Sequence, residues 1–321
     1  AGIPDAAGCT TVNKMCGSGM KTTMLAHDSL LAGTNEVIVA GGLESMSNAP
    51  YILQKARSGQ RLGHGQMIDH MFLDGLEDAF DKGTLMGVFA ERTAQKYGFS
   101  REAQDEFAIR SLTRAKKAIE DGSFKSEVTP VTFKNRKGET VVEQDEQPLI
   151  ADLDKIPKLR PAFEKDGTVT AANSSSISDG AAALILMRKS TAEKRRLKPL
   201  ARFLGHSSFA QAPEWFTTAP VGAIKNVLKT VGWKANDVDL FEINEAFAVV
   251  TMAAMKDLDL PVEKVNIHGG ACALGHPVGA SGTRILVTLI SALKKYGKTR
   301  GVAGLCIGGG EATAMAVEVM S

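Results

Sequence analysis

The alternation of apolar and polar residues near the N-terminus predicts a strand, a turn, a helix and a second strand. The segment 10–13 is predicted to be a short strand that ends in the glycine-rich elbow Met15-Cys16-Gly17-Ser18-Gly19. An amphipathic or buried helix is predicted over 18–32. An apolar run over 36–40 then predicts a buried strand of the parallel type that ends at Gly41-Gly42. This order of elements favours an α/β unit.

The same order recurs near the C-terminus. A strand is predicted over 264–267, followed by a glycine-rich turn over 269–282 that includes the start of a helix. The helix continues over 283–296, with lysines at the end where cations suit the helix dipole, and a strand follows over 300–306. We interpret the repeated order as an internal duplication that gives two facing α/β halves.

The segment between these repeats is richer in charged and polar residues, and we interpret it as an insertion that covers one face of the core. Helices are predicted over 86–97 and 100–121. The alternation over 124–146 is typical of strands or of an excursion from the core. The chain then returns to predicted strands at 168–171 and, fully buried, at 181–187.

Composition narrows the class of protein. With 321 residues, the chain can bury a large core. Its 38 Lys and Arg residues balance 36 Asp and Glu residues, which argues against the concentrated basic surface of a nucleic-acid-binding protein. No apolar run approaches the roughly 18 residues of a membrane span, so no membrane association is expected. Four cysteines favour reduced thiols in the cytoplasm. An organelle stays open, because the chain starts at Ala1 without a Met.

Cys16 is the candidate nucleophile. It follows a predicted strand and opens a predicted helix, where free N–H groups and the helix dipole are expected to lower the pKa of the thiol. The alternative is a small buried cysteine in a tight turn. His276 lies among glycines and is the candidate base that activates the thiol, with a capping or structural histidine as the alternative.

Two further segments complete the candidate chemistry. Cys306 ends a predicted apolar strand at a Gly-Gly-Gly turn, where a second thiol can move a proton to and from carbon; the alternative is a buried cysteine. Asn244 interrupts an apolar strand–helix junction and can orient a water or a carbonyl oxygen, unless it is a helix cap. The N–H groups of Cys16 and Gly308 could form an oxyanion pocket.

The segments around these four residues resemble the motifs of the thiolase family, in the family's order and over essentially the whole chain. The matching segments are Val12-Asn13-Lys14-Met15-Cys16-Gly17-Ser18-Gly19-Met20, Asn244-Glu245-Ala246-Phe247-Ala248, Gly275-His276-Pro277-Val278-Gly279-Ala280-Ser281-Gly282 and Cys306-Ile307-Gly308-Gly309-Gly310.

The resemblance implies a role for each residue. Cys16 attacks an acyl-CoA thioester and becomes acylated, while His276 takes the thiol proton. Cys306 removes a proton from the α-carbon of a second acetyl-CoA, or returns it in thiolysis. Asn244 holds a water that stabilises the enolate oxygen together with His276, and the N–H groups of Cys16 and Gly308 stabilise the tetrahedral intermediate. Coenzyme A thioesters are the substrates, and neither a metal nor a cofactor is expected.

The resemblance also implies a channel for the acyl group and the pantetheine arm. The residues at the matching positions are Leu85, Met86, Phe163, Ala171, Ser175, Phe216, Ala246 and Phe247. The segment 67–80 resembles short-chain thiolases that act on acetoacetyl-CoA. Three departures concern the substrate: Leu85 replaces a histidine of many biosynthetic members, Phe216 replaces a methionine, and Gln147-Pro148-Leu149 lacks an arginine expected near the adenine.

In architecture, the resemblance implies duplicated α/β halves in a layered αβαβα arrangement with an inserted loop domain. The N-terminal half comprises 1–45 and 173–197, the inserted loop domain over the CoA site 46–172, and the C-terminal half 198–321. Family members have further residues before the point where this chain starts, so the N-terminal half is expected to be incomplete. A homodimer or homotetramer is also expected.

The expected activity is an acyl transfer that makes or cleaves acetoacetyl-CoA. Three alternatives stay open. The first is a thiolase that acts on longer 3-ketoacyl-CoA. The second is a decarboxylating ketoacyl synthase, which does not need a thiol at the position of Cys306. The third is an inactive, truncated form that binds acyl-CoA without transferring the acyl group.

Overall fold

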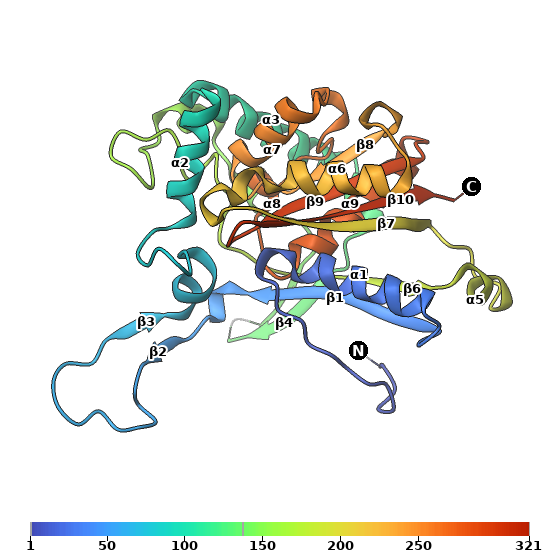
Figure 1. The fold of residues 1–321 in the computed structure, drawn as a ribbon, viewed down its shortest axis with the longest axis horizontal. Coiled ribbons are helices and arrows are strands. Elements are labelled where there is room, and N and C mark those ends of the chain that lie inside the picture. The colour runs from blue at the N-terminus through green and yellow to red at the C-terminus, as the bar shows by residue number, and fades with distance from the viewer. Residues whose placement is uncertain (1, 137, 321) are drawn as a thin grey trace.

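The computed structural model describes residues 2–136 and 138–320, which form two main sheets with helices between and above them (Figure 1). The strands of the described residues are β1 (Val37–Ser45), β2 (Tyr51–Leu53), β3 (Met67–Asp69), β4 (Val131–Asn135), β5 (Gly138–Val142), β6 (Asp179–Met187), β7 (Ala201–Ala210), β8 (Leu240–Ile243), β9 (Arg300–Ile307) and β10 (Glu311–Val319). The α-helices are α1 (Ser18–Leu31), α2 (Met86–Tyr97), α3 (Arg101–Glu120), α4 (Gln147–Ile150), α5 (Lys189–Lys194), α6 (Ala219–Val231), α7 (Ala248–Leu258), α8 (Ala271–Leu274) and α9 (Ser281–Lys295).

The helices α1 and α9 pack against each other between the two sheets (Figure 1). One sheet has the strand order β7-β10-β9-β8, in which only β8 and β9 are parallel. The other sheet is the antiparallel pair β1–β6. On the far side of the four-stranded sheet lies α6, with α7 packed beside it. The described residues thus form four of the five expected layers: the pair β1–β6, the helices α1 and α9, the four-stranded sheet, and the helices α6 and α7. The layered α/β fold is confirmed.

Apolar side chains fill both faces of the four-stranded sheet, since its strands are almost entirely buried. On the face covered by α6, the core includes Ile224, Val227, Phe241 and Val302. On the face covered by α1 and α9, it includes Met20, Met24, Ile285, Leu289 and Leu305. Burial of such side chains contributes about 1.5–3 kcal/mol each, so this sheet anchors the molecule.

The strand β1 differs from the predicted buried, parallel strand. It continues through Gly41 and Gly42 to Ser45 and pairs antiparallel with β6 over its whole length. One face of this pair packs on the central helices. On the other face Val39, Leu43 and Ile185 are 53%, 74% and 70% exposed. The predictions of fully buried strands here were wrong, because no second layer covers that face among the described residues.

The predicted strand at 10–13 is an irregular segment in the structure. Within the described residues it has no neighbouring strand, and the Asn13 side chain instead accepts a hydrogen bond from the Met15 N–H at 3.0 Å. Backbone groups bonded to local side chains form turns in place of ladders.

The strands predicted at 264–267 and 168–171 were also wrong, because side chains again bind backbone groups that a strand would use in its ladder. The segment 264–267 touches β8 through one bridge, Phe241 to Val265, after which Asn266 turns the chain with φ of 47° and bonds the backbone of Ile243 with its side chain. In the segment 168–171, the carboxylate of Glu91 accepts the N–H groups of Thr168 and Val169.

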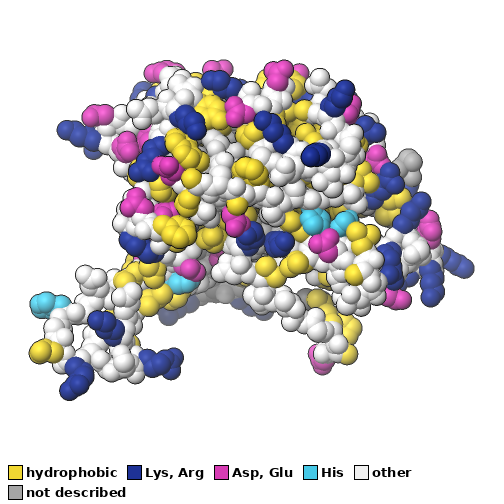
Figure 2. All heavy atoms as spheres, viewed as in Figure 1, with side chains coloured by type: hydrophobic (Ala, Val, Ile, Leu, Met, Phe, Trp, Pro, Cys, Tyr) yellow, Lys and Arg dark blue, Asp and Glu magenta, His cyan; other side chains and the backbone are white. Residues whose placement is uncertain are grey.

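The inserted region contains the predicted helices. The helix α2 has the predicted bounds, and α3 begins after Ser100, whose hydroxyl oxygen accepts the Ala103 N–H. The alternating stretch forms the hairpin β4–β5, and a second hairpin, β2–β3, precedes α2. Lys, Arg, Asp and Glu side chains are interspersed over the face shown in Figure 2, as expected for a net charge of +2. In the described part of the chain, every helix is too short or too polar to cross a membrane.

Glycines allow α1, β1 and the start of α9 to meet backbone against backbone. A Cβ atom on Gly42 would collide with the carbonyl of Gly279, and one on Gly19 would lie 2.7 Å from the hydroxyl oxygen of Thr283. Gly282 likewise faces the backbone of Met20. These approaches leave no room for a side chain, so the central helices can reach β1 only with glycine at these positions.

We predict that Gly42→Ala lowers the free energy of unfolding by at least about 2 kcal/mol, because the added methyl group must push rigid backbone aside. Chemical denaturation measures the effect. Gly75→Ala is the matched control, since no atom lies within 4 Å of a Cβ at Gly75, and it should change the free energy of unfolding by less than about 0.5 kcal/mol. Equal effects of the two variants would contradict the proposed close contact.

Candidate active site

Cys16 lies in a short helical turn, Met15–Gly17, directly before α1. Met15 has φ of 46°, a left-handed conformation that is costly for a residue with a side chain. Ser18 holds the turn, since its hydroxyl accepts the Lys14 N–H at 2.9 Å and donates to the Met15 carbonyl at 2.7 Å. Lys14 also forms an ion pair with Glu311 of β10. The elbow is therefore tied to both halves of the molecule.

The pKa of the Cys16 thiol is shifted in the opposite direction to the one expected from the sequence. The pKa of this thiol is raised to about 11, chiefly by burial. Hydrogen bonds from the N–H groups of Gly308 and of Cys16 itself lower the pKa by less, and the charge of Glu44 raises it further. The predicted lowering of the pKa was wrong, because it considered the helix end without the protein that surrounds the sulfur. Cys16 keeps a partly exposed surface, so a substrate can reach a thiol that is protonated at neutral pH.

His276 is buried beside Ser281 of α9. The Ser281 hydroxyl lies 3.0 Å from the Pro277 carbonyl, to which it donates, and 2.5 Å from Nδ1 of His276. The serine oxygen therefore accepts a hydrogen bond from the Nδ1–H group, and the lone pair is left on Nε2. Nε2 is buried and has no hydrogen-bond partner among the described residues.

The pKa of His276 is lowered to about 4, chiefly by burial and further by the positive charge of Arg284. The imidazole is therefore neutral at physiological pH. A neutral imidazole with a free Nε2 can accept a proton, so the structure fits the base predicted from the sequence.

Asn244 follows β8, and its N–H donates to the carbonyl of Gly304 in β9. Its side-chain nitrogen lies 3.4 Å from Nδ1 of His276, while its Oδ1 is buried without a partner among the described residues. Because α7 begins at Ala248 after Phe247, Asn244 does not cap that helix, and the capping alternative was wrong. Asn244 and His276 are neighbouring side chains, and each has one buried polar atom without a hydrogen-bond partner among the described residues: Oδ1 of Asn244 and Nε2 of His276.

Cys306 lies at the end of β9 and is fully buried. Burial raises the pKa of its thiol well above the ordinary value, and the charge of Cys16 raises it further. Cys16 is therefore close enough to Cys306 to influence the ionisation of its thiol. Gly308 begins the turn between β9 and β10, and the sulfur of Met86 lies 3.3 Å from the position that a Cβ on Gly308 would take.

Most of the residues predicted to line the substrate channel lie around Cys306. Met86, Phe163, Phe216, Ala246 and Phe247 form one apolar cluster with Cys306. The rings of Phe163 and Phe247 meet edge to face, with centroids 5.9 Å apart.

The other three predicted channel residues lie outside this cluster. Ser175 is bound to the Ala246 carbonyl through both its N–H and its hydroxyl at 3.0 Å. Leu85 directly precedes α2, and Ala171 is exposed. The role of each of the eight in binding substrate stays a prediction.

Three residues that position the site, Ser281, Glu44 and Glu245, were assigned no role from the sequence. Ser281 sets the tautomer of His276. Glu44 accepts the Gly279 N–H at 2.9 Å and so fixes the His276 loop to β1. Glu245 is fully buried and bonds Ser111, Asn266 and the Cys272 N–H. The available signal for Glu245 was a carboxylate within an apolar junction, which also holds Glu242. The roles of the other two residues depend on tertiary contacts.

Comparison with known families matches both halves of the chain. Residues 1–190 match the family described as "Thiolase, N-terminal domain", and residues 197–319 match "Thiolase, C-terminal domain". An acetyl-CoA acetyltransferase of Arabidopsis thaliana is 49% identical over 324 aligned residues, covering 100% of this chain and 80% of its own. Acetyl-CoA acetyltransferase IA of Candida tropicalis is 46% identical, covering 99% of this chain and 79% of its own.

Solved structures agree with these relatives. The acetyl-CoA acetyltransferase of Bacillus anthracis has a TM-score of 0.96 at 43% identity, and a thiolase of Ascaris suum in complex with coenzyme A has 0.92 at 41%. Each covers 99% of this chain, which spans 81% of theirs. Matches to both domains, together with relatives more than 40% identical over nearly the whole chain, show that it belongs to the thiolase family.

Proposed function

We propose that this protein is an acetyl-CoA C-acetyltransferase, which converts two acetyl-CoA into acetoacetyl-CoA and coenzyme A, and catalyses the reverse thiolysis, through an acyl-cysteine. One observation supports this most directly: the thiol of Cys306 lies within electrostatic range of Cys16, in one site with a neutral histidine whose Nε2 has no partner among the described residues. The names of the relatives support the same reaction.

In the first half-reaction, the sulfur of Cys16 bonds to the thioester carbon of acetyl-CoA, and its proton passes to Nε2 of His276. The carbonyl oxygen becomes an oxyanion, to which the N–H groups of Cys16 and Gly308 can donate. When the carbon–sulfur bond to coenzyme A breaks, Cys306 gives its proton to the leaving thiolate. The products are acetyl-Cys16, free coenzyme A and a Cys306 thiolate.

In the second half-reaction, the Cys306 thiolate removes a proton from the α-carbon of a second acetyl-CoA. Burial raises the pKa of this thiol, so its thiolate is a strong base suited to a weakly acidic C–H bond. The enolate oxygen is stabilised beside Asn244 and protonated His276. The enolate carbon attacks acetyl-Cys16, the Cys16 thiolate leaves and recovers its proton from His276, and acetoacetyl-CoA is formed. No redox partner or metal is required for this balance.

The apolar cluster around Cys306 provides a dry place for the acetyl group. Phe216 is 3% exposed and packs edge to face on Phe89, so it limits the length of acyl chain that fits. We therefore favour acetoacetyl-CoA over longer 3-ketoacyl-CoA. The exposed apolar face of β1–β6 supports the expectation of a homodimer or homotetramer, in which a second copy could cover it.

Variants of the two thiols should separate the two half-reactions. In Cys16→Ser, thiolysis of acetoacetyl-CoA should fall at least about 10³-fold, and acetylation of the chain by acetyl-CoA should be lost, because the nucleophile is missing. Cys306→Ala should still accept one acetyl group at Cys16, but more slowly, because the leaving thiolate must then take its proton from water, and it should fail to condense the acetyl group. Intact-protein mass spectrometry with peptide mapping measures acetylation. The control is Cys9→Ser, which removes an exposed thiol outside the proposed site. A fully active Cys16→Ser variant would contradict the mechanism.

The low pKa of His276 predicts an unusual pH profile for acetylation of Cys16. A base with a pKa of about 4 is neutral above that pH and becomes protonated only below it. The acetylation rate should therefore stay within about threefold between pH 7 and about pH 5, where an ordinary histidine would already be mostly protonated. Single-turnover acetylation measures this rate. A loss centred near the ordinary histidine pKa of 6.5 would exclude the buried neutral imidazole as the base.

Enlarging the acyl pocket should change the substrate preference. Phe216→Ala should raise the ratio of kcat/KM for 3-ketohexanoyl-CoA to that for acetoacetyl-CoA by about tenfold or more, because two added methylenes then fit. The ratio is independent of how much enzyme is folded. Leu31→Ala, at a residue that is 71% exposed at the end of α1, is the control. A preference for the longer substrate already in the unaltered chain would favour the long-chain alternative.

A further inference from the structure

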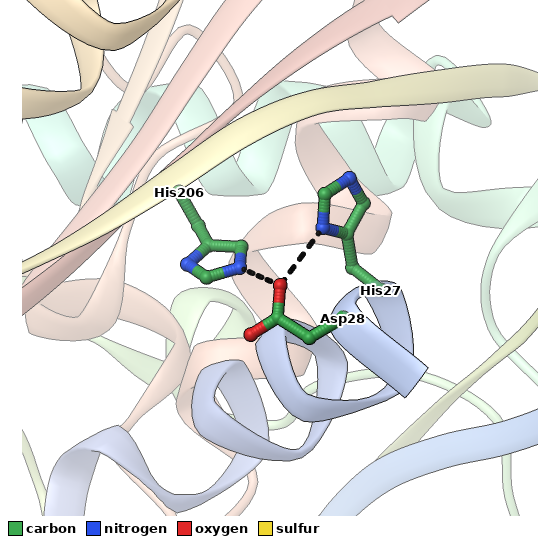
Figure 3. Close-up of side chains that lie close together, drawn as sticks. All are labelled: His27, Asp28 and His206. Carbon is green, nitrogen blue, oxygen red and sulfur yellow. Dashed lines mark hydrogen bonds and ion pairs between the residues drawn. The ribbon is translucent and has the colours of Figure 1, made fainter. Parts of the chain in front are cut away.

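Two histidines far apart in the sequence meet one carboxylate on the surface between the two halves. His27 and Asp28 lie in the last turns of α1, and His206 lies in β7 (Figure 3). The Nδ1 atom of His27 is 3.4 Å and the Nε2 atom of His206 is 2.8 Å from the same oxygen, Oδ1 of Asp28. Neither histidine belongs to one of the four sequence motifs.

The donor atoms are compact enough for one metal ion. One atom from each of the three side chains lies within 4.8 Å of the others. In a tetrahedral zinc site, ligand atoms about 2.1 Å from the ion are separated by about 3.4 Å. The distance from His27 to Asp28 is 3.4 Å, and the distance from His206 to Asp28 is shorter, at 2.8 Å. A small rotation of the side chains would give the coordinating geometry.

The surroundings hold the two imidazoles in place while they leave the carboxylate accessible. The side chains of His27 and His206 are 17% and 18% exposed, and their rings meet edge to face with centroids 5.3 Å apart. The side chain of Asp28 is 56% exposed. The ligands are thus mounted on a helix and a strand rather than on loops, and solvent can supply a fourth ligand.

The charge of the cluster also suits a cation. Asp28 supplies a carboxylate, which in an ordinary aspartate is negatively charged at neutral pH. Neutral imidazoles offer nitrogen lone pairs. Imidazole nitrogens together with a carboxylate oxygen are a ligand set typical of zinc and other divalent transition metals.

We propose that His27, Asp28 and His206 form a binding site for a divalent transition-metal ion, with Zn²⁺ the best match, in which water completes a tetrahedron. His27 lies eleven residues beyond Cys16, about 15 Å along the helix, so this site is separate from the thiol chemistry. Because α1 and β7 belong to different halves of the molecule, the ion would cross-link them. Metal binding therefore stabilises the packing of α1 against the four-stranded sheet.

The test must exclude zinc binding by accessible thiols. In the Cys9→Ser/Cys16→Ser background, isothermal titration with Zn²⁺ should show one equivalent bound with a Kd of about 10 μM or tighter. Co²⁺ should give the visible absorption of a tetrahedral ion without the near-ultraviolet band of thiolate ligation. Saturating Zn²⁺ should raise Tm.

Ligand variants decide whether the cluster is the site. Asp28→Asn and His206→Gln, which keep hydrogen-bonding capacity, should each weaken Zn²⁺ binding at least about tenfold and abolish the rise in Tm. His70→Gln is the matched control, because His70 lies 3.5 Å from Asp74 in another exposed His–Asp pair, and it should bind Zn²⁺ as before. Metal-free unfolding curves check that each variant folds.

Two results would overturn the proposal. One is the absence of saturable, one-to-one Zn²⁺ binding, which would make the cluster a hydrogen-bonded His–Asp–His bridge. The other is binding that persists in both Asp28→Asn and His206→Gln, which would place the ion elsewhere.

Discussion

The contact between the backbones of Gly42 and Gly279 is the constraint on which the active site depends. It brings β1 of one half against the loop that precedes α9 of the other, at the level where α1 begins. Glu44 fastens the same junction by accepting the Gly279 N–H, and the Thr283 hydroxyl donates to the Gly19 carbonyl. The elbow of Cys16 and the loop of His276 both lie at this junction, so the packing of two helix starts positions the proposed nucleophile and the proposed base.

Burial then sets the chemistry of the groups that meet there. It raises the pKa values of Cys16 and Cys306 and lowers that of His276, so all three are uncharged at rest. An uncharged site can be desolvated without a large electrostatic cost. In the proposed mechanism, the N–H groups of Cys16 and Gly308 supply fixed dipoles where charge develops during the reaction, and proton transfers among the three side chains keep the net charge balanced.

Local sequence patterns predicted much of this fold. The bounds of α2, the glycine elbow before α1 and the helix α9 after its glycine-rich turn follow from periodicity and turn chemistry, and the four motifs indicate the catalytic side chains. Strand predictions failed where polar side chains replace ladder hydrogen bonds, as Asn266 and Glu91 do. The pKa of Cys16 and the meeting of His27 with His206 depend on residues distant in the sequence, which no local pattern encodes.

The most direct test of the proposed active site is the structure of this chain after brief exposure to acetyl-CoA. We expect an acetyl group on Sγ of Cys16, with its carbonyl oxygen within hydrogen-bond distance of the Gly308 N–H and the Cys306 sulfur facing the acetyl group. An acetyl group on Cys306 or Cys9, or a Cys16 adduct whose oxygen points away from Gly308, would contradict the proposed assembly of the site.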